Sequence, residues 1–179
     1  MRVIAGSLKG RALKAPDWEG LRPTSDKLRE TLFNILAPRI GGATVLDGFA
    51  GTGAIGIEAL SRGAAHVTFV EQDPRALTLI AGNLDACGIV GGYSIIRGSV
   101  MRAGAILSGQ TFDIVVLDPP YDVDDLSGVV AAAAPCVASA GTLVLEHAKR
   151  RGAPASAANL IQRRDLRSGD SALAFYTAA

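Results

Sequence analysis

Short apolar runs alternate along the chain with segments whose apolar residues recur every three or four positions. The run Phe112–Leu117 is mostly apolar and rich in β-branched residues, and Gly109 and two prolines bound it. Such a run predicts a strand buried on both faces of a parallel sheet. Further strands are expected at Val45–Asp47, Val67–Glu71, Tyr93–Ile96, Gly141–Glu146, Leu160–Arg167 and Ala172–Thr177.

The segments between these strands have helical spacing. The first helix includes Leu28, Leu32 and Leu36, with Thr24 or Ser25 as its cap, and Pro38 and the glycines after it are expected to end it. Other helices are expected from Ile57 onwards and over Pro74–Cys87, Met101–Leu107 and Leu126–Val137, the last interrupted near Pro135. Alternating strands and helices indicate an α/β protein with a mostly parallel sheet.

The N-terminal segment carries much of the positive charge. Two short strands, Arg2–Ala5 and Arg11–Lys14, are expected to form a hairpin. Trp18 is expected to pack under it, with stacking on a base as the alternative. From Met1 to Arg39 there are eight basic and four acidic residues, whereas the rest of the chain has a net negative charge. A basic arm of this kind suits a nucleic-acid contact, although a solvated surface has the same composition. The candidate RNA contacts are Lys9, Arg11, Arg22, Thr24 and Arg29.

Composition narrows the class of protein further. A chain of 179 residues is expected to form one domain, and no apolar run is long enough to span a bilayer. Cys87 and Cys136 are far apart, and His66 and His147 are the only histidines, so no metal site is predicted. We therefore expect a cytoplasmic protein without a membrane partner or a signal peptide.

The residues Asp118-Pro119-Pro120-Tyr121 follow an expected strand directly. The carboxyl end of a strand is where open α/β sheets bind ligands. Here the chain offers a carboxylate, carbonyl oxygens and a flat aromatic ring, which together suit a planar group bearing an amine, such as a nucleobase. The simpler alternative is a proline turn that only ends the strand.

The segment Gly51–Gly56 matches the dinucleotide fingerprint G-x-G-x-x-G, so a nicotinamide-dependent oxidoreductase is one candidate. Asp47 precedes this loop, where a carboxylate would repel a pyrophosphate. The same carboxylate suits the cationic amino group of S-adenosylmethionine, which has no phosphate. Glu71 lies about 20 residues after Gly51, a spacing that suits a ribose hydroxyl.

These motifs resemble those of class I S-adenosylmethionine-dependent methyltransferases. The stretches RPTSDKLRETLFNIL, VIAGSLKGRAL and EALSRGA, with Asp-Pro-Pro-Tyr at 118–121, are similar to the bacterial 16S rRNA guanine-N2 methyltransferase family called RsmD. The resemblance implies a Rossmann-like, seven-stranded, mostly parallel sheet with helices on both faces. It also implies a basic N-terminal extension at 1–40, with a hairpin and a helix, before a methyltransferase domain at 41–179.

The resemblance assigns roles to individual residues. S-adenosylmethionine is the implied cofactor, and 16S rRNA or the small ribosomal subunit is the implied partner of a monomeric enzyme without a metal. The implied catalytic residues are Asp118, Pro119, Pro120 and Tyr121. The implied cofactor-binding residues are Asp47, Phe49, Gly51, Gly53, Glu71, Ser99 and Val100. In many such enzymes an acid meets the adenine amine where this chain has Ser99.

The implied reaction is methyl transfer to the N2 amine of a guanine that is extruded or already unpaired. Two alternatives stay open. An adenine-N6 DNA methyltransferase would use the same acceptors and aromatic ring for another planar amine. A noncatalytic RNA-binding or assembly module on this fold would bind the cofactor without transferring its methyl group.

Overall fold

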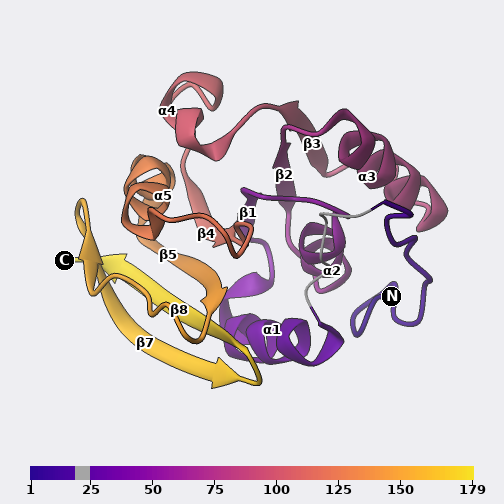
Figure 1. Ribbon diagram of the computed structural model, residues 1–179. Helices are drawn as coiled ribbons and strands as arrows, with labels where there is room; N and C mark the ends of the chain where they lie inside the picture. Colours follow the sequence, from indigo (N-terminus) through magenta and orange to yellow (C-terminus); the bar gives the residue numbers. More distant parts are fainter. Residues whose placement is uncertain (19–24) are drawn as a thin grey trace.

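One mixed sheet organises the chain (Figure 1). The computed structural model describes residues 1–18 and 25–179. The strands of the sheet are β1 Thr44–Asp47, β2 His66–Glu71, β3 Tyr93–Arg97, β4 Phe112–Leu117, β5 Val137–Ala148, β6 Ser156–Ala157, β7 Leu160–Ser168 and β8 Ser171–Ala178. Their order across the sheet is β3-β2-β1-β4-β5-β8-β7-β6.

The strands β1 to β5 run parallel, and β8 pairs with β5 in the antiparallel direction. This arrangement confirms the predicted Rossmann-like class. Within the described residues the sheet has eight strands and not seven, because the two-residue β6 pairs with the start of β7. The strand order reverses between β1 and β4, which is the position where doubly wound sheets bind ligands at their carboxyl edge.

Helices cover both faces of the sheet, as the alternating pattern predicts. One face carries α1 Asp26–Ile40, α2 Ala54–Ser61 and α3 Pro74–Ala86, whose apolar residues share a core with alternate sheet residues. The other face carries α4 Ala103–Ile106 and α5 Leu126–Ala133 with the short 3₁₀ turns η1 Val100–Arg102 and η2 Ala134–Cys136. In the described part of the chain, no helix combines the length and apolarity needed to cross a membrane.

Two helix ends differ from the sequence-based expectation. The first helix continues past Pro38 to Ile40, because a proline so near the end removes only one of the last hydrogen bonds. The segment Leu126–Val137 was expected to be a helix interrupted near Pro135. The α-helix ends at Ala133, and a 3₁₀ turn containing Pro135 leads into β5.

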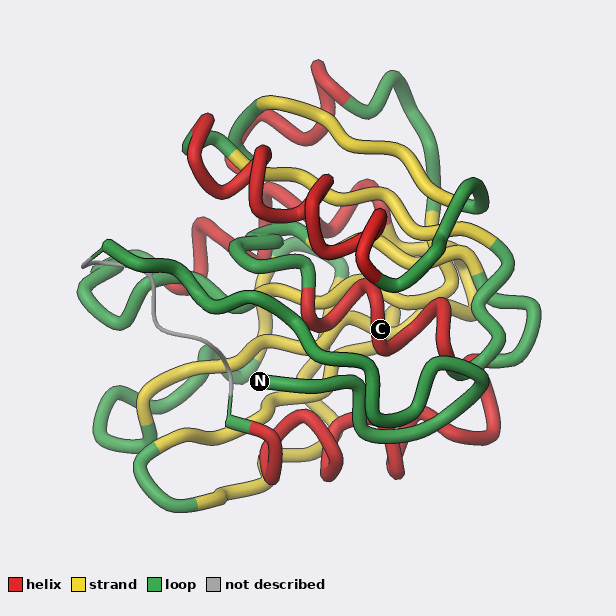
Figure 2. The backbone as a smooth tube through the Cα atoms, turned by 90° about the vertical axis from the view of Figure 1, so that its right-hand side faces the viewer, coloured by secondary structure: helices red, strands yellow, loops and turns green. Residues whose placement is uncertain are grey.

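The expected N-terminal hairpin is reduced to a single antiparallel bridge between Arg2 and Ala12. The backbone N–H groups of Ile4 and Ala5 do not continue a strand, because they donate to the buried carboxylate of Glu58 on α2, at 2.8 and 3.0 Å. The segment 1–18 is therefore a loop fastened onto the helical layer (Figure 2).

The proposed extension at 1–40 does not have a separate core. Val3 and Leu13 of the N-terminal loop and Phe33 of α1 are buried in the same apolar cluster as Val45 and Val67 of the sheet. A contact with α3 adds to this attachment, since Lys14 and the side chain of Asn83 exchange two hydrogen bonds. The described residues of this segment thus share their core with the sheet.

Candidate active site

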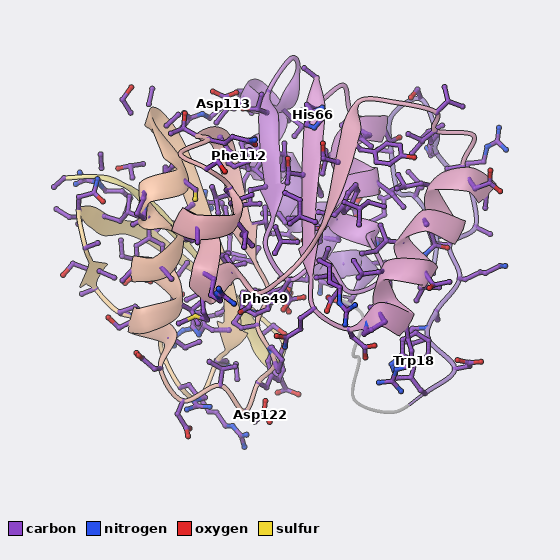
Figure 3. The ribbon with its side chains drawn as sticks, turned by 90° about the horizontal axis from the view of Figure 1, so that it is seen from above. Trp18, Phe49, His66, Phe112, Asp113 and Asp122 are labelled. Carbon is purple, nitrogen blue, oxygen red and sulfur yellow. The ribbon has the colours of Figure 1, made fainter. Side chains whose placement is uncertain are left out.

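A cavity of about 820 Å³ lies at the carboxyl edge of the parallel strands. Figure 3 shows this edge at the lower side of the view, marked by Phe49, Asp122 and Trp18, while His66, Phe112 and Asp113 mark the opposite edge, where β2 and β4 begin. Segments that follow β1, β2, β3 and β4 line the cavity, together with the end of β5 and the turn between β7 and β8. The strand ends that the sequence singled out therefore meet in one space.

The segment Asp118–Tyr121 forms part of the cavity wall directly after β4. All four residues line the cavity, with Pro119 buried, Pro120 exposed and the two outer residues half-buried. The Pro120 carbonyl accepts a hydrogen bond from the N–H of Val123 at 3.0 Å, which closes a turn. Because prolines fix the backbone and donate no N–H, this wall is stiff and rich in acceptors.

The phenol of Tyr121 is held by two side chains that the sequence did not single out for this role. Its hydroxyl donates to Oε1 of Glu146 at 3.3 Å and hydrogen-bonds to Oγ of Ser171. Burial raises the pKa of Tyr121 above its ordinary value, the Ser171 hydrogen bond opposes the shift, and the nearby Glu146 and Asp118 carboxylates add to it. The ring therefore stays a neutral donor with a fixed position.

Glu71 forms the opposite part of the cavity wall, at the end of β2. Its Oε2 accepts the N–H of Gly51 at 2.8 Å, and its Oε1 accepts the N–H groups of Gln72 and Asp73. These bonds fix the carboxylate against the glycine loop. A carboxylate has about four acceptor sites, so it can also accept a ligand hydroxyl.

The glycine loop, residues 51–56, lies next to the cavity wall, but its glycines do not line the cavity. Gly51 and Gly53 have φ of 53° and 78°, a left-handed conformation that favours glycine, and both are buried outside the cavity lining. Asp47 is also buried outside the lining, where its Oδ2 accepts the N–H of Gly56 at 3.0 Å. In this structure the three residues shape the glycine loop behind the cavity wall. Their predicted contacts with the cofactor stay a prediction.

The pKa of the Asp47 carboxyl is raised to about 7, mainly by burial and to a smaller extent by the Asp118 and Glu71 carboxylates, while the Gly56 hydrogen bond opposes the rise. Asp47 is therefore partly protonated near neutral pH.

The remaining cofactor-binding candidates do line the cavity. Phe49 follows β1, and Ser99 and Val100 follow β3. The Ser99 hydroxyl accepts the N–H of Met101 at 3.3 Å and so caps η1. It still presents a polar group beside the apolar Val100, which suits the edge of a purine.

Trp18 lies at the cavity and not under a hairpin. It lines the cavity, and the guanidinium of Arg75 on α3 stands 5.0 Å from the centre of its ring. Asp73 in turn pairs with Arg75 at 2.7 Å. Nothing local in the sequence predicts this cluster, because it depends on how the N-terminal loop crosses α3.

The protein-family model described as conserved hypothetical protein 95 matches residues 1–177. The chain belongs to this family. It is 36% identical over 180 residues to the protein YlbH of Bacillus subtilis, covering 98% of each protein. It is 46% identical over 121 residues to "Ribosomal RNA small subunit methyltransferase D" of Escherichia coli, covering 68% of this chain and 60% of that protein.

The solved structure of the Escherichia coli protein yhhF resembles this chain with a TM-score of 0.86 and 36% identity, over 99% of this chain and 97% of that one. The family resemblance drawn from the motifs is thereby confirmed. The similarity includes the N-terminal loop and α1 as well as the sheet, which fits their shared core.

Among the candidate RNA-contact residues that the structure describes, Arg29 differs from the others in its burial. Lys9 and Arg11 are exposed on the N-terminal loop, whereas Arg22 and Thr24 lie outside the described residues. The side chain of Arg29 is fully buried, so a direct RNA contact there is wrong.

Arg29 instead ties the N-terminal loop to the helices. Its Nη2 donates to the carbonyl of Arg2 and to Asp26, and its Nε is 3.9 Å from the buried carboxylate of Glu58. A sequence signal for this position existed. Arg29 precedes Leu32 and Phe33 by three and four residues, which places it on the apolar face of α1.

Proposed function

We propose that this chain transfers a methyl group from S-adenosylmethionine to the exocyclic N2 amine of a guanine in 16S rRNA of the small ribosomal subunit. The observation that carries the proposal is the joint lining of one cavity by Asp118–Tyr121 and by Glu71. One end of the cavity thus suits an amine on a planar base, and the other suits a ribose. The relative named for small-subunit rRNA methylation supports the choice of RNA.

The residues present fit S-adenosylmethionine better than a dinucleotide. Glu71 offers acceptors for ribose hydroxyls, Phe49 and Val100 offer apolar contacts for adenine, and Ser99 offers a hydroxyl at its edge. The cavity of about 820 Å³ lies in the usual range for small-molecule sites. When bound, S-adenosylmethionine supplies an electrophilic methyl group on a cationic sulfur.

The protein has to make a poor nucleophile react, because the lone pair of the guanine amine is delocalised into the ring. Asp118 and the carbonyl of Pro119 accept the N–H bonds and favour a pyramidal nitrogen. Tyr121 stacks on the base, a contact worth roughly 1–3 kcal/mol. The proton released from the amine passes to Asp118 or to solvent. Alignment of the nitrogen with the methyl group accounts for the remaining acceleration of methyl transfer.

The test is incubation of small ribosomal subunits, free rRNA and DNA with methyl-labelled S-adenosylmethionine, followed by mapping of the label. We expect label on one guanine of 16S rRNA and N2-methylguanosine after digestion. Label on adenine in DNA would replace the proposal with the adenine-N6 alternative. Cofactor binding without any methylated nucleic acid would favour a noncatalytic module. Calorimetry should give binding of S-adenosylmethionine and none of NAD.

A further inference from the structure

We propose that the carboxylate of Glu146 accepts the N1–H of the target guanine and makes the site selective for guanine over adenine. This inference rests on the function proposed above. It adds Glu146, a residue of β5, to the site. Asp118 and Tyr121 could bind any planar base with an amine, so they do not by themselves distinguish guanine from adenine.

Strand register brings Glu146 beside Asp118. In the β4–β5 pair, Val116 is opposite Val144 and Leu117 is opposite Leu145, so Asp118 and Glu146 are the next neighbours along these strands. Val116 and Val144 belong to one core cluster, and Leu117 and Leu145 belong to the other. Because side chains alternate along strands, Glu146 lies on the face of Val144. Asp118 directly follows β4, and continuation of the same alternation would put it on that face, where both acids line the cavity.

Glu146 combines burial with access to the cavity. Only 4% of the residue is exposed, yet it lines the cavity together with Asp118 and Pro119. Its Oε1 accepts a hydrogen bond from Tyr121, whose ring is expected to stack on the base. The carboxylate is therefore held beside the hydroxyl end of the ring on which the base would stack, where it can reach the edge of that base. A carboxylate accepts several hydrogen bonds at once.

The edges of the two purines differ at the position that this carboxylate would meet. Guanine presents two adjacent donors, N1–H and the N2 amine, which suit two neighbouring carboxylates. Adenine presents an amine beside N1, which is an acceptor and would be repelled by Glu146. A site that hydrogen-bonds a substrate N–H rejects analogues that lack it, because a buried polar group loses its partner.

The test compares guanine with 2-aminopurine, which keeps the N2 amine but has an acceptor at N1. Small subunits are reconstituted with 16S rRNA that carries either base at the mapped site, and kcat/KM for methyl transfer is measured. We expect the wild-type protein to prefer guanine by about tenfold or more. Glu146→Gln keeps an oxygen for Tyr121 and adds an amide donor for N1 of 2-aminopurine, so the preference should fall to within about threefold.

Ser171→Ala is the matched control, because it removes the other partner of the Tyr121 hydroxyl without changing the recognition of N1. It should lower kcat/KM on both bases by the same factor. An unchanged preference in Glu146→Gln, or a wild-type protein that uses both bases equally, would overturn the assignment of Glu146 while leaving the proposed function intact. Failure of the wild-type protein to methylate any guanine would overturn both.

Discussion

Tyr121 and Ser171 are 50 residues apart in the sequence, and their hydroxyl groups share a hydrogen bond. Tyr121 belongs to the loop after β4, whereas Ser171 begins β8, and β5 lies between these two strands. The bond therefore fastens the wall formed by Asp118–Tyr121 to the β7–β8 turn, which also lines the cavity. The position of the ring depends on the C-terminal strands as well as on the prolines.

This bond gives the Tyr121 hydroxyl a role that the ring alone does not have. Tyr121→Phe keeps the stacking surface but removes two hydrogen bonds, each worth about 1 kcal/mol. We expect it to lower kcat/KM for methyl transfer by about tenfold, and Tyr121→Ala to lower it further. Methyl-transfer kinetics with melting curves on the same preparations measure this. Wild-type activity in Tyr121→Phe would show that the hydroxyl does not position the ring.

Asp118 is expected to act on the target amine and not on folding, because it lies beyond the end of β4 and is half-buried. Asp118→Ala should lower turnover by at least about a hundredfold. Its affinity for S-adenosylmethionine, measured by calorimetry, should stay within about threefold of wild type. Tight cofactor binding in a folded Asp118→Ala protein with full turnover would exclude this residue from the chemistry.

The location of much of this site could be predicted from the sequence, because the carboxyl ends of parallel strands lie at one edge of the sheet. Glu71 and Asp118 each follow a recognisable apolar run, so their meeting in one cavity follows from the fold class. Glu146 and Ser171 could not be assigned, since their contacts with Tyr121 depend on the order of β4, β5 and β8. No local pattern encodes which strand lies beside which.

For Arg29, two features of the sequence predicted different locations in the structure. Positive charge in an N-terminal segment predicts a surface contact, but the apolar periodicity of α1 places this residue inside. Composition predicted an exposed Arg29, whereas the apolar periodicity of α1 predicted a buried one. The buried position is possible because the carboxylate of Glu58 lies 3.9 Å from the guanidinium. Burial of a charge is tolerated only where such partners exist.

Arg29 and the pair Lys9 and Arg11 should therefore give different phenotypes. Arg29→Met removes the hydrogen bonds from Arg29 to the Arg2 carbonyl and to Asp26 and weakens the ion pairing of Glu58, which keeps Arg62 at 2.8 Å. It should therefore lower the free energy of unfolding by about 3 kcal/mol. The double variant Lys9→Ala, Arg11→Ala should unfold like wild type but bind RNA more weakly. Its plot of log affinity against log salt should be shallower by about 0.7 to 0.9 per lost phosphate contact.

Arg102→Ala is the control for RNA binding, since Arg102 is an exposed cation on η1, at the opposite face from the N-terminal loop. It should leave the salt dependence unchanged. If the double variant and the control bind RNA identically across the salt series, the N-terminal loop is a solvated surface.

Gly6 and Gly10 provide a matched pair for the docking of the N-terminal loop. Both have φ of 85°, so alanine introduces the same backbone strain at each. A Cβ at Gly6 would lie 1.9 Å from the carbonyl oxygen of Ser61, whereas a Cβ at Gly10 meets nothing within 4 Å. Gly6→Ala should therefore destabilise the protein by about 1–3 kcal/mol more than Gly10→Ala in denaturant unfolding. Equal values would mean that the loop does not stay docked on α2.

Asp47 should leave a signature in the pH dependence of stability. Its pKa is raised from 3.8 to about 7 by burial, so the folded protein keeps the proton over a range in which the unfolded chain has lost it. The folded state therefore binds more protons between pH 4 and 7, and this residue's contribution to stability falls as the pH rises through that range. Asp47→Asn keeps an oxygen for the N–H of Gly56 but cannot ionise. The melting temperature of Asp47→Asn minus that of wild type should thus increase from pH 4.5 to pH 8. A difference that stays constant across this range would show that Asp47 is ionised in the folded protein.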